Sequence, residues 1–282
     1  MYYIVYLIYT MNYLLNIIKV IIIVLIVIFI IIYSNHDYKL FIAEYFYFKN
    51  TPAKYGYLLN NNILDTSLQK QNKIAVVTFD TRHDEYIQKH NINVQKYCDK
   101  WKYDYFYYDK CDHNVYWCKL HFVLDLLKTN NYDYVVWLDS DTIIKKYDIS
   151  FDSIVNSFSS DIFVTIDGMT SVYNAGVFFI KNSQIGISYL EECIEHNKSE
   201  CYKSDGSLKG QWSGLCYEQG IMNKLIFDKY YKYTTCLSVE LVKNVLADPE
   251  LEICDFDTFI LHLYVSSSED RDKCFSKYVQ KS

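Results

Sequence analysis

Short apolar runs alternate with amphipathic stretches from residue 73 onward, and this alternation predicts an α/β fold. Lys73–Phe79 (KIAVVTF) and Val135–Leu138 (VVWL) are too short for helices, so each predicts a strand buried on both faces. Asn114–Lys128 repeats its apolar positions at intervals of three and four, which predicts a helix with Asn114 as candidate N-cap. Weaker patterns predict helices over 86–101, 151–158, 183–196 and 217–227, strands over 103–108, 161–166, 177–180 and 258–264, and a mobile polar loop over 197–215.

The first three strands and the two helices between them form two βα units. Such units predict a mainly parallel sheet with helices on both faces. We expect one folded domain over 73–282, because the chain is long enough for a single substantial core.

The longest apolar stretch lies before this domain. Tyr13–Tyr33 has 21 residues interrupted only by Asn16 and Lys19, and a helix of that length spans about 31 Å, the thickness of a bilayer core. We predict a signal anchor rather than a cleaved signal peptide, because no small-residue cleavage site follows. The predicted organisation is a single-pass type II membrane protein with a lumenal domain, comprising a tail at 1–12, an anchor at 13–33, a stem at 34–72 and the domain at 73–282.

Composition narrows the function classes. The chain has 282 residues and a net charge of −6, with acidic residues spread along it, so we expect no nucleic-acid partner. Its nine cysteines include no C-x-x-C pair, which argues against a structural zinc site. Cys193 and Cys201 bracket a glycosylation triplet, Asn197-Lys198-Ser199, a pattern that suits a lumenal loop closed by a disulfide.

Two aspartates, Asp139 and Asp141, follow the strand Val135–Leu138 in the segment VVWLDSDTII. Open α/β sheets bind ligands at the carboxyl ends of their strands, and two like charges so close together are unfavourable unless a cation offsets them. The pair therefore predicts a divalent metal site.

One alternative for this acidic pair is a solvated turn whose carboxylates bond to their own backbone. Another is a phosphatase of the haloacid dehalogenase type, whose nucleophile motif also combines an apolar strand, D-x-D and threonine.

The chain from about Lys73 to Tyr264 resembles glycosyltransferase family 34, which includes yeast Golgi mannosyltransferases, fission-yeast galactosyltransferases and plant xyloglucan xylosyltransferases. Four segments match in order, followed by a late His262: NINVQKYCDKWKYDYFYY, WCKLHFVLDLL leading to VVWLDSDTII, YNAGVFFIKNSQIGISYLEEC, and YEQGIMNKL. The resemblance implies a GT-A fold and a retaining transfer of a hexose or pentose from a UDP- or GDP-sugar to a glycan or glycoprotein. A family 8 glycosyltransferase and an inactive membrane-tethered sugar-binding protein are the alternatives.

The resemblance also implies roles for particular residues. Asp139, Asp141 and His262 would hold Mn²⁺, with Mg²⁺ also possible, since two carboxylates and an imidazole suit Mn²⁺. Glu218 and Gln219 match a catalytic pair that faces the donor sugar. Donor-binding positions would be Thr78, Phe79, Asp80, Lys119, Asp139, Ser140, Asn174, Ala175 and Gly176.

These assignments have ordinary structural alternatives. His262 is equally a core histidine, Lys119 a solvated lysine, Asp80 a turn aspartate and the Asn-Ala-Gly segment a tight turn before a strand. The chain also departs from the family pattern. Tyr217 stands where the family commonly has a second acidic residue, and no clear glycine follows His262.

Overall fold

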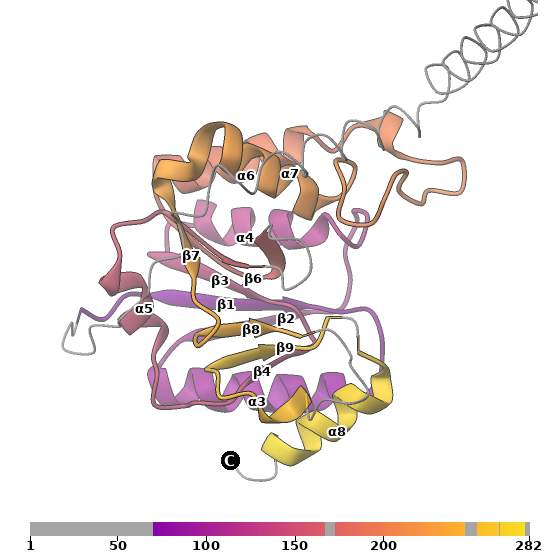
Figure 1. Cartoon of the computed structure of the whole chain (residues 1–282). Helices are drawn as coiled ribbons and strands as arrows, with labels where there is room; N and C mark the ends of the chain where they lie inside the picture. Colours follow the sequence, from indigo (N-terminus) through magenta and orange to yellow (C-terminus); the bar gives the residue numbers. More distant parts are fainter. Residues whose placement is uncertain (1–69, 167–172, 246–252, 265, 280–282) are drawn as a thin grey trace, which may run out of the picture.

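The computed structural model describes residues 70–166, 173–245, 253–264 and 266–279. These residues form a six-stranded sheet in the order β2-β1-β3-β6-β5-β7 and a three-stranded sheet in the order β4-β9-β8 (Figure 1). The strands are β1 Ile74–Phe79, β2 Asp104–Tyr108, β3 Tyr134–Leu138, β4 Thr142–Ile144, β5 Ile162–Ile166, β6 Tyr173–Lys181, β7 Thr234–Leu237, β8 Val242–Asn244 and β9 Ile260–His262. The α-helices are α3 Glu85–Trp101, α4 Cys118–Lys128, α5 Phe151–Ser157, α6 Gln184–Glu195, α7 Glu218–Leu225 and α8 Ser268–Val279.

The large sheet is mainly parallel. β1 pairs in parallel with β2 and β3, and β5 pairs in parallel with β7. Of the described strands in this sheet, β6 alone runs in the opposite sense, between β3 and β5. The carboxyl ends of β1 and β3 therefore meet at one edge of the sheet. The predicted α/β fold with a mainly parallel sheet is confirmed.

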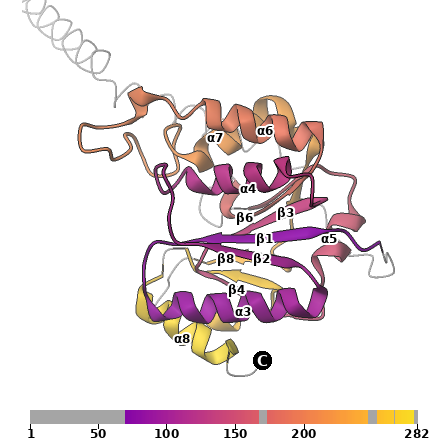
Figure 2. The ribbon, with the colours of Figure 1, turned by 180° about the vertical axis from the view of Figure 1, so that it is seen from behind.

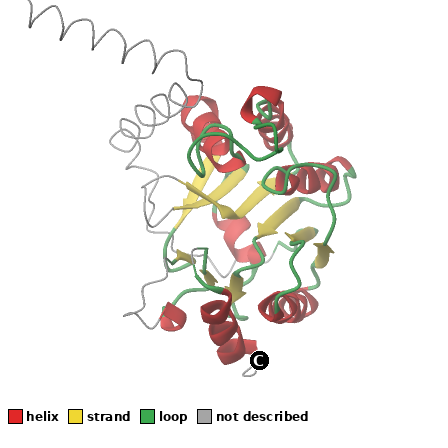
Figure 3. Cartoon of the chain, turned by 90° about the vertical axis from the view of Figure 1, so that its right-hand side faces the viewer, coloured by secondary structure: helices red, strands yellow, loops and turns green. Residues whose placement is uncertain are grey.

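Helices cover both faces of the large sheet, as predicted. α4, α6 and α7 pack on one face, whereas α3, the small sheet and α8 lie on the other (Figures 1 and 2). The side view shows the strands between the two groups of helices (Figure 3). In β3, Val135 and Trp137 belong to one hydrophobic core, and Val136 and Leu138 belong to the other. Burial on both faces explains why this strand is apolar at every position.

The helix predicted from Asn114 begins four residues later, at Cys118. The backbone carbonyl of Asn114 accepts hydrogen bonds from the amides of Trp117 (2.8 Å) and Cys118 (3.2 Å), so residues 114–117 form a turn. This turn leaves Val115 50% exposed and Tyr116 37% exposed. The apolar pattern begins before the helix because Val115 and Tyr116 are apolar side chains that lie on the surface and not in the core.

The Asn-Ala-Gly segment lies within β6 and is not a turn before it. β6 begins at Tyr173, so Asn174, Ala175 and Gly176 are strand residues that run beside the end of β3.

The sequence patterns did not predict α8, because Arg271, Cys274 and Phe275 are its only buried residues and its mean hydropathy is low.

Three disulfides link Cys111 to Cys118, Cys201 to Cys216 and Cys254 to Cys274. The expected closure of a loop between Cys193 and Cys201 is wrong, because Cys193 is a buried thiol on α6. The polar loop before α7 is instead tied at its base by the Cys201–Cys216 disulfide.

The membrane localisation needs correction. In the described part of the chain, no helix combines the length and apolar character needed to cross a bilayer. The longest described helix, α3, has 17 residues and carries a polar face with several charged side chains. The predicted anchor at 13–33 lies outside the described residues. The structure therefore does not support the prediction of a single-pass type II membrane protein.

His90 on α3 is fully buried between the two sheets. Its Nδ1 lies 2.8 Å from the carbonyl oxygen of Thr142, and its Nε2 lies 3.0 Å from Oγ1 of Thr78. Burial lowers the pKa of His90 to about 4, despite the opposing effect of the Thr142 carbonyl. The neutral imidazole therefore holds the end of β1 to the start of β4.

We predict that His90 makes folding sensitive to acid. Because its folded pKa lies below the unfolded value of about 6.5, the unfolded chain binds this proton first as the pH falls. The contribution of His90 is complete above about pH 6.5 and decreases as the pH falls through about 4, by up to about 3 kcal/mol. Denaturant unfolding across this interval measures the loss. His90→Gln does not titrate and should lose less stability than the wild type; equal losses would contradict the prediction.

Candidate active site

Asp139 lies at the carboxyl end of β3, where the antiparallel neighbour β6 holds it. Its backbone amide donates to the carbonyl of Gly176 at 2.8 Å. Its Oδ1 accepts hydrogen bonds from Nε1 of Trp137 at 2.6 Å and from Nζ of Lys119 at 3.0 Å. The carboxylate is therefore oriented by its own strand and by α4.

The small sheet brings Asp141 and His262 to the same place. Thr142 in β4 pairs with His262 in β9, so Asp141 lies next to the histidine. Nε2 of His262 is 3.1 Å from Oδ1 of Asp141 and 3.9 Å from Oδ2 of Asp139. One potential ligand atom from each of the three residues lies within 4.8 Å of the others. Residues from two sheets thus form one cluster.

Asn244 sets the orientation of the His262 ring. The amide nitrogen of Asn244 donates to Oγ1 of Thr165 and to the carbonyl of Ile166, which leaves its Oδ1 to accept from Nδ1 of His262 at 2.7 Å. In the neutral imidazole, Nε2 then carries a lone pair that faces the carboxylates. This buried Nε2 makes no hydrogen bond to any described residue.

A cation fits this arrangement. A lone pair that faces carboxylate oxygens is repelled unless a positive charge lies between them. Two carboxylates and one imidazole nitrogen are ligands that suit Mn²⁺. The buried cluster of Asp139, Asp141 and His262 can therefore hold a divalent metal ion.

Gly176 makes the close approach of His262 possible. A Cβ atom at this position would lie 2.0 Å from Cε1 of the His262 ring, which is far inside contact distance. The glycine in β6 is therefore a steric requirement of the cluster and not a turn residue.

Arg271 on α8 holds the second oxygen of Asp141. Its Nη2 donates to Oδ2 of Asp141 at 2.9 Å, while its Nε donates to the carbonyl of Leu263 at 3.1 Å. Burial alone would raise the pKa of the Asp141 carboxyl, but His262, whenever its ring is protonated, and the Arg271 guanidinium lower it well below its ordinary range. Asp141 therefore stays ionised, with one oxygen bound by Arg271 and the other directed at His262.

Lys119 joins the acidic pair to α7. Its Nζ lies 3.0 Å from Oδ1 of Asp139 and 3.2 Å from Oε1 of Glu218. Burial alone would lower the pKa of Lys119, but the two carboxylates raise it above its ordinary value. Burial raises the pKa of Glu218, and Lys119 only partly opposes this shift. Lys119 is thus a buried cation and not a solvated lysine.

Glu218 and Gln219 each have one polar atom engaged. Glu218 uses Oε1 for Lys119, and Gln219 uses Oε1 to accept from the backbone amide of Ala175 at 3.0 Å. The other atoms, Oε2 of Glu218 and Nε2 of Gln219, are buried and make no hydrogen bond to any described residue. Buried polar atoms of this kind are unfavourable until a ligand or water satisfies them.

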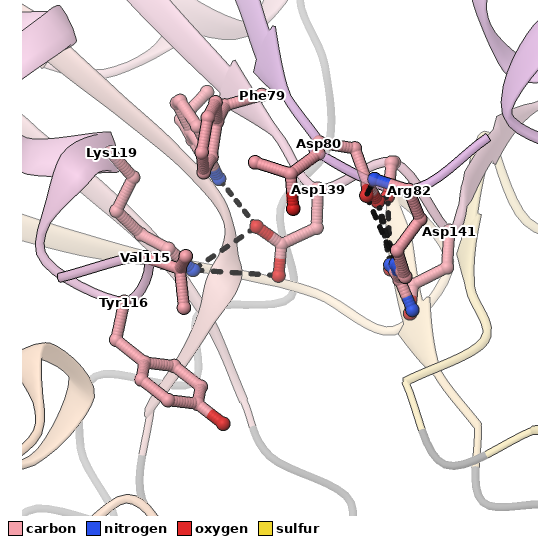
Figure 4. Close-up of a pocket in the computed structure, with 11 residues that line it drawn as sticks. Phe79, Asp80, Arg82, Val115, Tyr116, Lys119, Asp139 and Asp141 are labelled. Atoms are coloured by element: carbon pink, nitrogen blue, oxygen red, sulfur yellow. Dashed lines mark hydrogen bonds and ion pairs between the residues drawn. The ribbon is translucent and has the colours of Figure 1, made fainter. Parts of the chain in front are cut away.

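A cavity of about 380 Å³ opens beside the acidic pair (Figure 4). Thr78 does not line it: this residue is fully buried, and its Oγ1 lies 3.0 Å from Nε2 of His90 and 2.9 Å from the carbonyl oxygen of Leu138. The sequence-predicted Phe79, Asp80, Lys119, Asp139, Ser140 and Asp141 all line the cavity, together with Thr81, Arg82, Val115, Tyr116 and Trp137.

Arg82 and Ser140 satisfy the hydrogen-bond acceptors of the Asp80 carboxylate. Its carboxylate accepts from the backbone amide of Arg82 at 2.8 Å, from the Arg82 guanidinium at 2.6 and 2.9 Å, and from the Ser140 hydroxyl. Burial alone would raise the pKa of Asp80, but Arg82 and Ser140 lower it below its ordinary value.

Sequence reasoning did not identify Arg82, Asn244 or Arg271. Arg82 follows Asp80 by two positions at the same strand end, so its position was a usable signal. Asn244 and Arg271 lie in segments that carry no recognisable motif.

A mainly parallel α/β sheet with two aspartates at a strand end and a late histidine beside them fits the GT-A class of glycosyltransferases. Residues 69–274 match the family model of nucleotide-diphospho-sugar transferases, and the chain belongs to this family. It is therefore a glycosyltransferase. A comparison with curated protein sequences gives no significant match.

One solved structure supports the fold. A glycosyltransferase involved in the glycosylation of the major capsid of PBCV-1 is 14% identical, with a TM-score of 0.55 over 73% of this chain and 99% of that one. The glycosyltransferase GlyE of Streptococcus pneumoniae TIGR4 is also 14% identical, with a TM-score of 0.42 over 75% and 63% of the two chains. The first supports the fold, and the second is too distant to add to it.

We predict that Arg271 positions Asp141 for metal binding. Arg271→Met removes the hydrogen bond that orients the carboxylate and should weaken Mn²⁺ binding on the order of 10- to 100-fold. Arg271→Lys keeps the charge and should recover part of the affinity. Electron paramagnetic resonance titration of free Mn²⁺ measures both effects.

Lys89→Met is the matched control. Lys89 ties α3 to α8 through Asp272 at 2.6 Å and Ser276 at 2.8 Å, without contacting Asp141. It should leave Mn²⁺ affinity close to that of the wild type. An equal loss in both variants would mean that Arg271 acts only by docking α8.

Proposed function

We propose that this chain is a metal-dependent, retaining glycosyltransferase of the family 34 type. It transfers a hexose or pentose from a UDP- or GDP-sugar to a glycan or glycoprotein acceptor. The observation that carries this proposal is the convergence of Asp139, Asp141 and His262 beside the cavity at the carboxyl ends of β1 and β3. That edge is where open α/β sheets bind nucleotide ligands.

The charges around the cavity suit a nucleoside diphosphate as leaving group. A divalent ion held by Asp139, Asp141 and His262 would neutralise negative charge that develops on the diphosphate as the glycosidic bond breaks. Lys119 lies 3.0 Å from Asp139 on the wall of the same cavity and keeps its proton. Its ammonium limits the repulsion between the protein's carboxylates and an incoming phosphate.

Glu218 and Gln219 are the proposed catalytic residues. Each has a buried polar atom without a partner among the described residues, and the hydroxyls of a donor sugar would satisfy such atoms. Glu218 contacts Lys119, which in turn contacts Asp139, so the pair adjoins the acidic cluster. A retaining transfer uses either a nucleophile of the enzyme or attack on the face that the leaving group vacates. In either route these two side chains would contact the donor sugar.

An aromatic pair supports a glycan as acceptor. Tyr116 lines the cavity, and its ring lies 5.0 Å from that of Tyr217 in an edge-on contact. Tyr217 immediately precedes Glu218 and replaces the acidic residue common in family 34. The C–H face of a pyranose packs well against an aromatic ring. We therefore assign Tyr217 to acceptor contact and not to proton transfer.

Two of the other candidate functions, the phosphatase and the inactive sugar-binding protein, fit the site less well. A haloacid dehalogenase phosphatase carries its nucleophilic aspartate on the first strand of its domain, whereas Asp139 follows the third described strand of a chain that belongs to a different family. A family 8 enzyme would keep the same metal residues and donor class and would differ in its acceptor. An inactive sugar-binding protein would not need the three ligand residues of the cluster.

A donor screen tests this proposal. With Mn²⁺ and a panel of UDP- and GDP-sugars, the protein should slowly release nucleoside diphosphate even without an acceptor. Asp141→Asn should abolish the metal-dependent part of nucleotide binding, because it removes a charged ligand. Calorimetric titration with UDP and GDP, with Mn²⁺ and then with EDTA, measures this part.

In EDTA Asp141→Asn should bind nucleotide no more weakly than the wild type, because it removes a negative charge, and this comparison serves as the internal control. Nucleotide affinity that is unchanged by Asp141→Asn in the presence of Mn²⁺ would refute the metal assignment. No hydrolysis and no nucleotide binding by the wild type would favour the inactive sugar-binding alternative.

A further inference from the structure

Two basic residues, Arg82 and Lys119, are among the described residues that line the cavity. The Lys119 side chain is only 10% exposed, and its ammonium is shared between Asp139 and Glu218. The Arg82 side chain is 51% exposed, although it pairs with Asp80. Among the described lining residues, Arg82 therefore offers the positive charge that an incoming anion can reach most directly.

Arg82 lies beside the acidic cluster. Its Nη2 is 3.4 Å from Oγ of Ser140, the residue between Asp139 and Asp141. Figure 4 shows Arg82 next to Asp141 and on the other side of Asp139 from Lys119. An anion that binds a cation at the cluster would therefore lie within reach of the guanidinium.

Asp80 keeps Arg82 in this position. The Asp80 carboxylate is only 5% exposed, and both of its oxygens accept hydrogen bonds from Arg82. Nη1 of Arg82 makes no hydrogen bond to any described residue, so the guanidinium retains donors for a ligand. Asp80 is thus better suited to hold Arg82 than to contact the donor itself.

We propose that Arg82 binds the diphosphate of the nucleotide-sugar donor and that Asp80 positions Arg82 for this contact. This inference rests on the proposed function. A planar guanidinium presents paired N–H groups that match two oxygens of a phosphate, which an ammonium cannot do. Arg82 would also compensate for the repulsion that the carboxylates of the cavity exert on the donor.

Calorimetric titration of the full chain with UDP and GDP in the presence of Mn²⁺ tests this inference. Arg82→Met should weaken binding on the order of 10- to 100-fold, as expected for the loss of charged hydrogen bonds. Arg82→Lys should show a smaller loss. Displacement of UDP by inorganic pyrophosphate should weaken in parallel, because the contact is with phosphate and not with the nucleoside.

Lys146→Met is the matched control for removing a surface cation. Lys146 pairs with Asp257 at 2.7 Å and does not line the cavity. This variant loses the same type of ion pair and should bind UDP and GDP as the wild type does.

A double variant separates direct contact from charge balance. Arg82→Met leaves the Asp80 carboxylate unpaired, and that charge alone would repel an anion. Asp80→Asn combined with Arg82→Met removes both charges. If Arg82 contacts the diphosphate, the double variant still binds more weakly than the wild type, because removing the Asp80 charge does not replace the lost contact. Recovery of wild-type affinity would show that Arg82 only neutralises Asp80, and would overturn the inference.

Two further results would overturn it. One is unchanged UDP and GDP affinity in Arg82→Met, and the other is weaker UDP binding with unchanged pyrophosphate binding. Both leave the proposed function intact, because the wild type still binds nucleotide. A wild-type chain that binds neither UDP nor GDP would overturn the inference and the proposed function together.

Discussion

Repulsion among carboxylates at the end of β3 is the constraint on which the active site depends. Asp139 and Asp141 lie within a few ångströms of one another in a largely buried place, where a pair of like charges is unfavourable. Two buried basic side chains on separate helices offset this repulsion. Lys119 on α4 pairs with Asp139, and Arg271 on α8 pairs with Asp141. A different part of the chain therefore supplies the counter-charge of each aspartate.

The basic side chains of this site differ in role. Lys119 and Arg271 pair with the aspartates inside the protein, whereas Arg82 lies where a ligand can reach it. The side chains of Lys119 and Arg271 are each only 10% exposed, and each is bound by several oxygens. Arg82 is half exposed at the cavity. His262 contributes no compensating charge while it is neutral, and its Nε2 faces the two aspartates. Among the described residues, the site therefore combines an acidic cluster paired with buried cations and a basic side chain, Arg82, that solvent reaches.

The sequence predicted the central elements well, because β1, β3 and α4 have strong local patterns. The acidic pair could be interpreted from its position after a buried strand, whereas His262 was identified only through an ordered resemblance to a family. The start of α4 was placed too early, since exposed Val115 and Tyr116 continue the apolar rhythm beyond the helix. α8 was missed because few of its residues are buried. A hydrophobic pattern predicts a helix from its buried face. Val115 and Tyr116 are apolar but exposed and lie outside the helix, whereas α8 is a helix with few buried residues.

The sequence by itself determined the α/β class, the strand that carries the acidic pair and the residue types of a metal cluster. Only the tertiary structure decided which charges meet. Arg271 and Asp141 are 130 positions apart, and Asn244 and His262 belong to neighbouring strands whose pairing no local pattern indicated. Periodicity depends on a residue's nearest neighbours along the chain, but an ion pair depends on the path of the whole backbone. The partners of Asp141 and His262 therefore became visible only when that path was known.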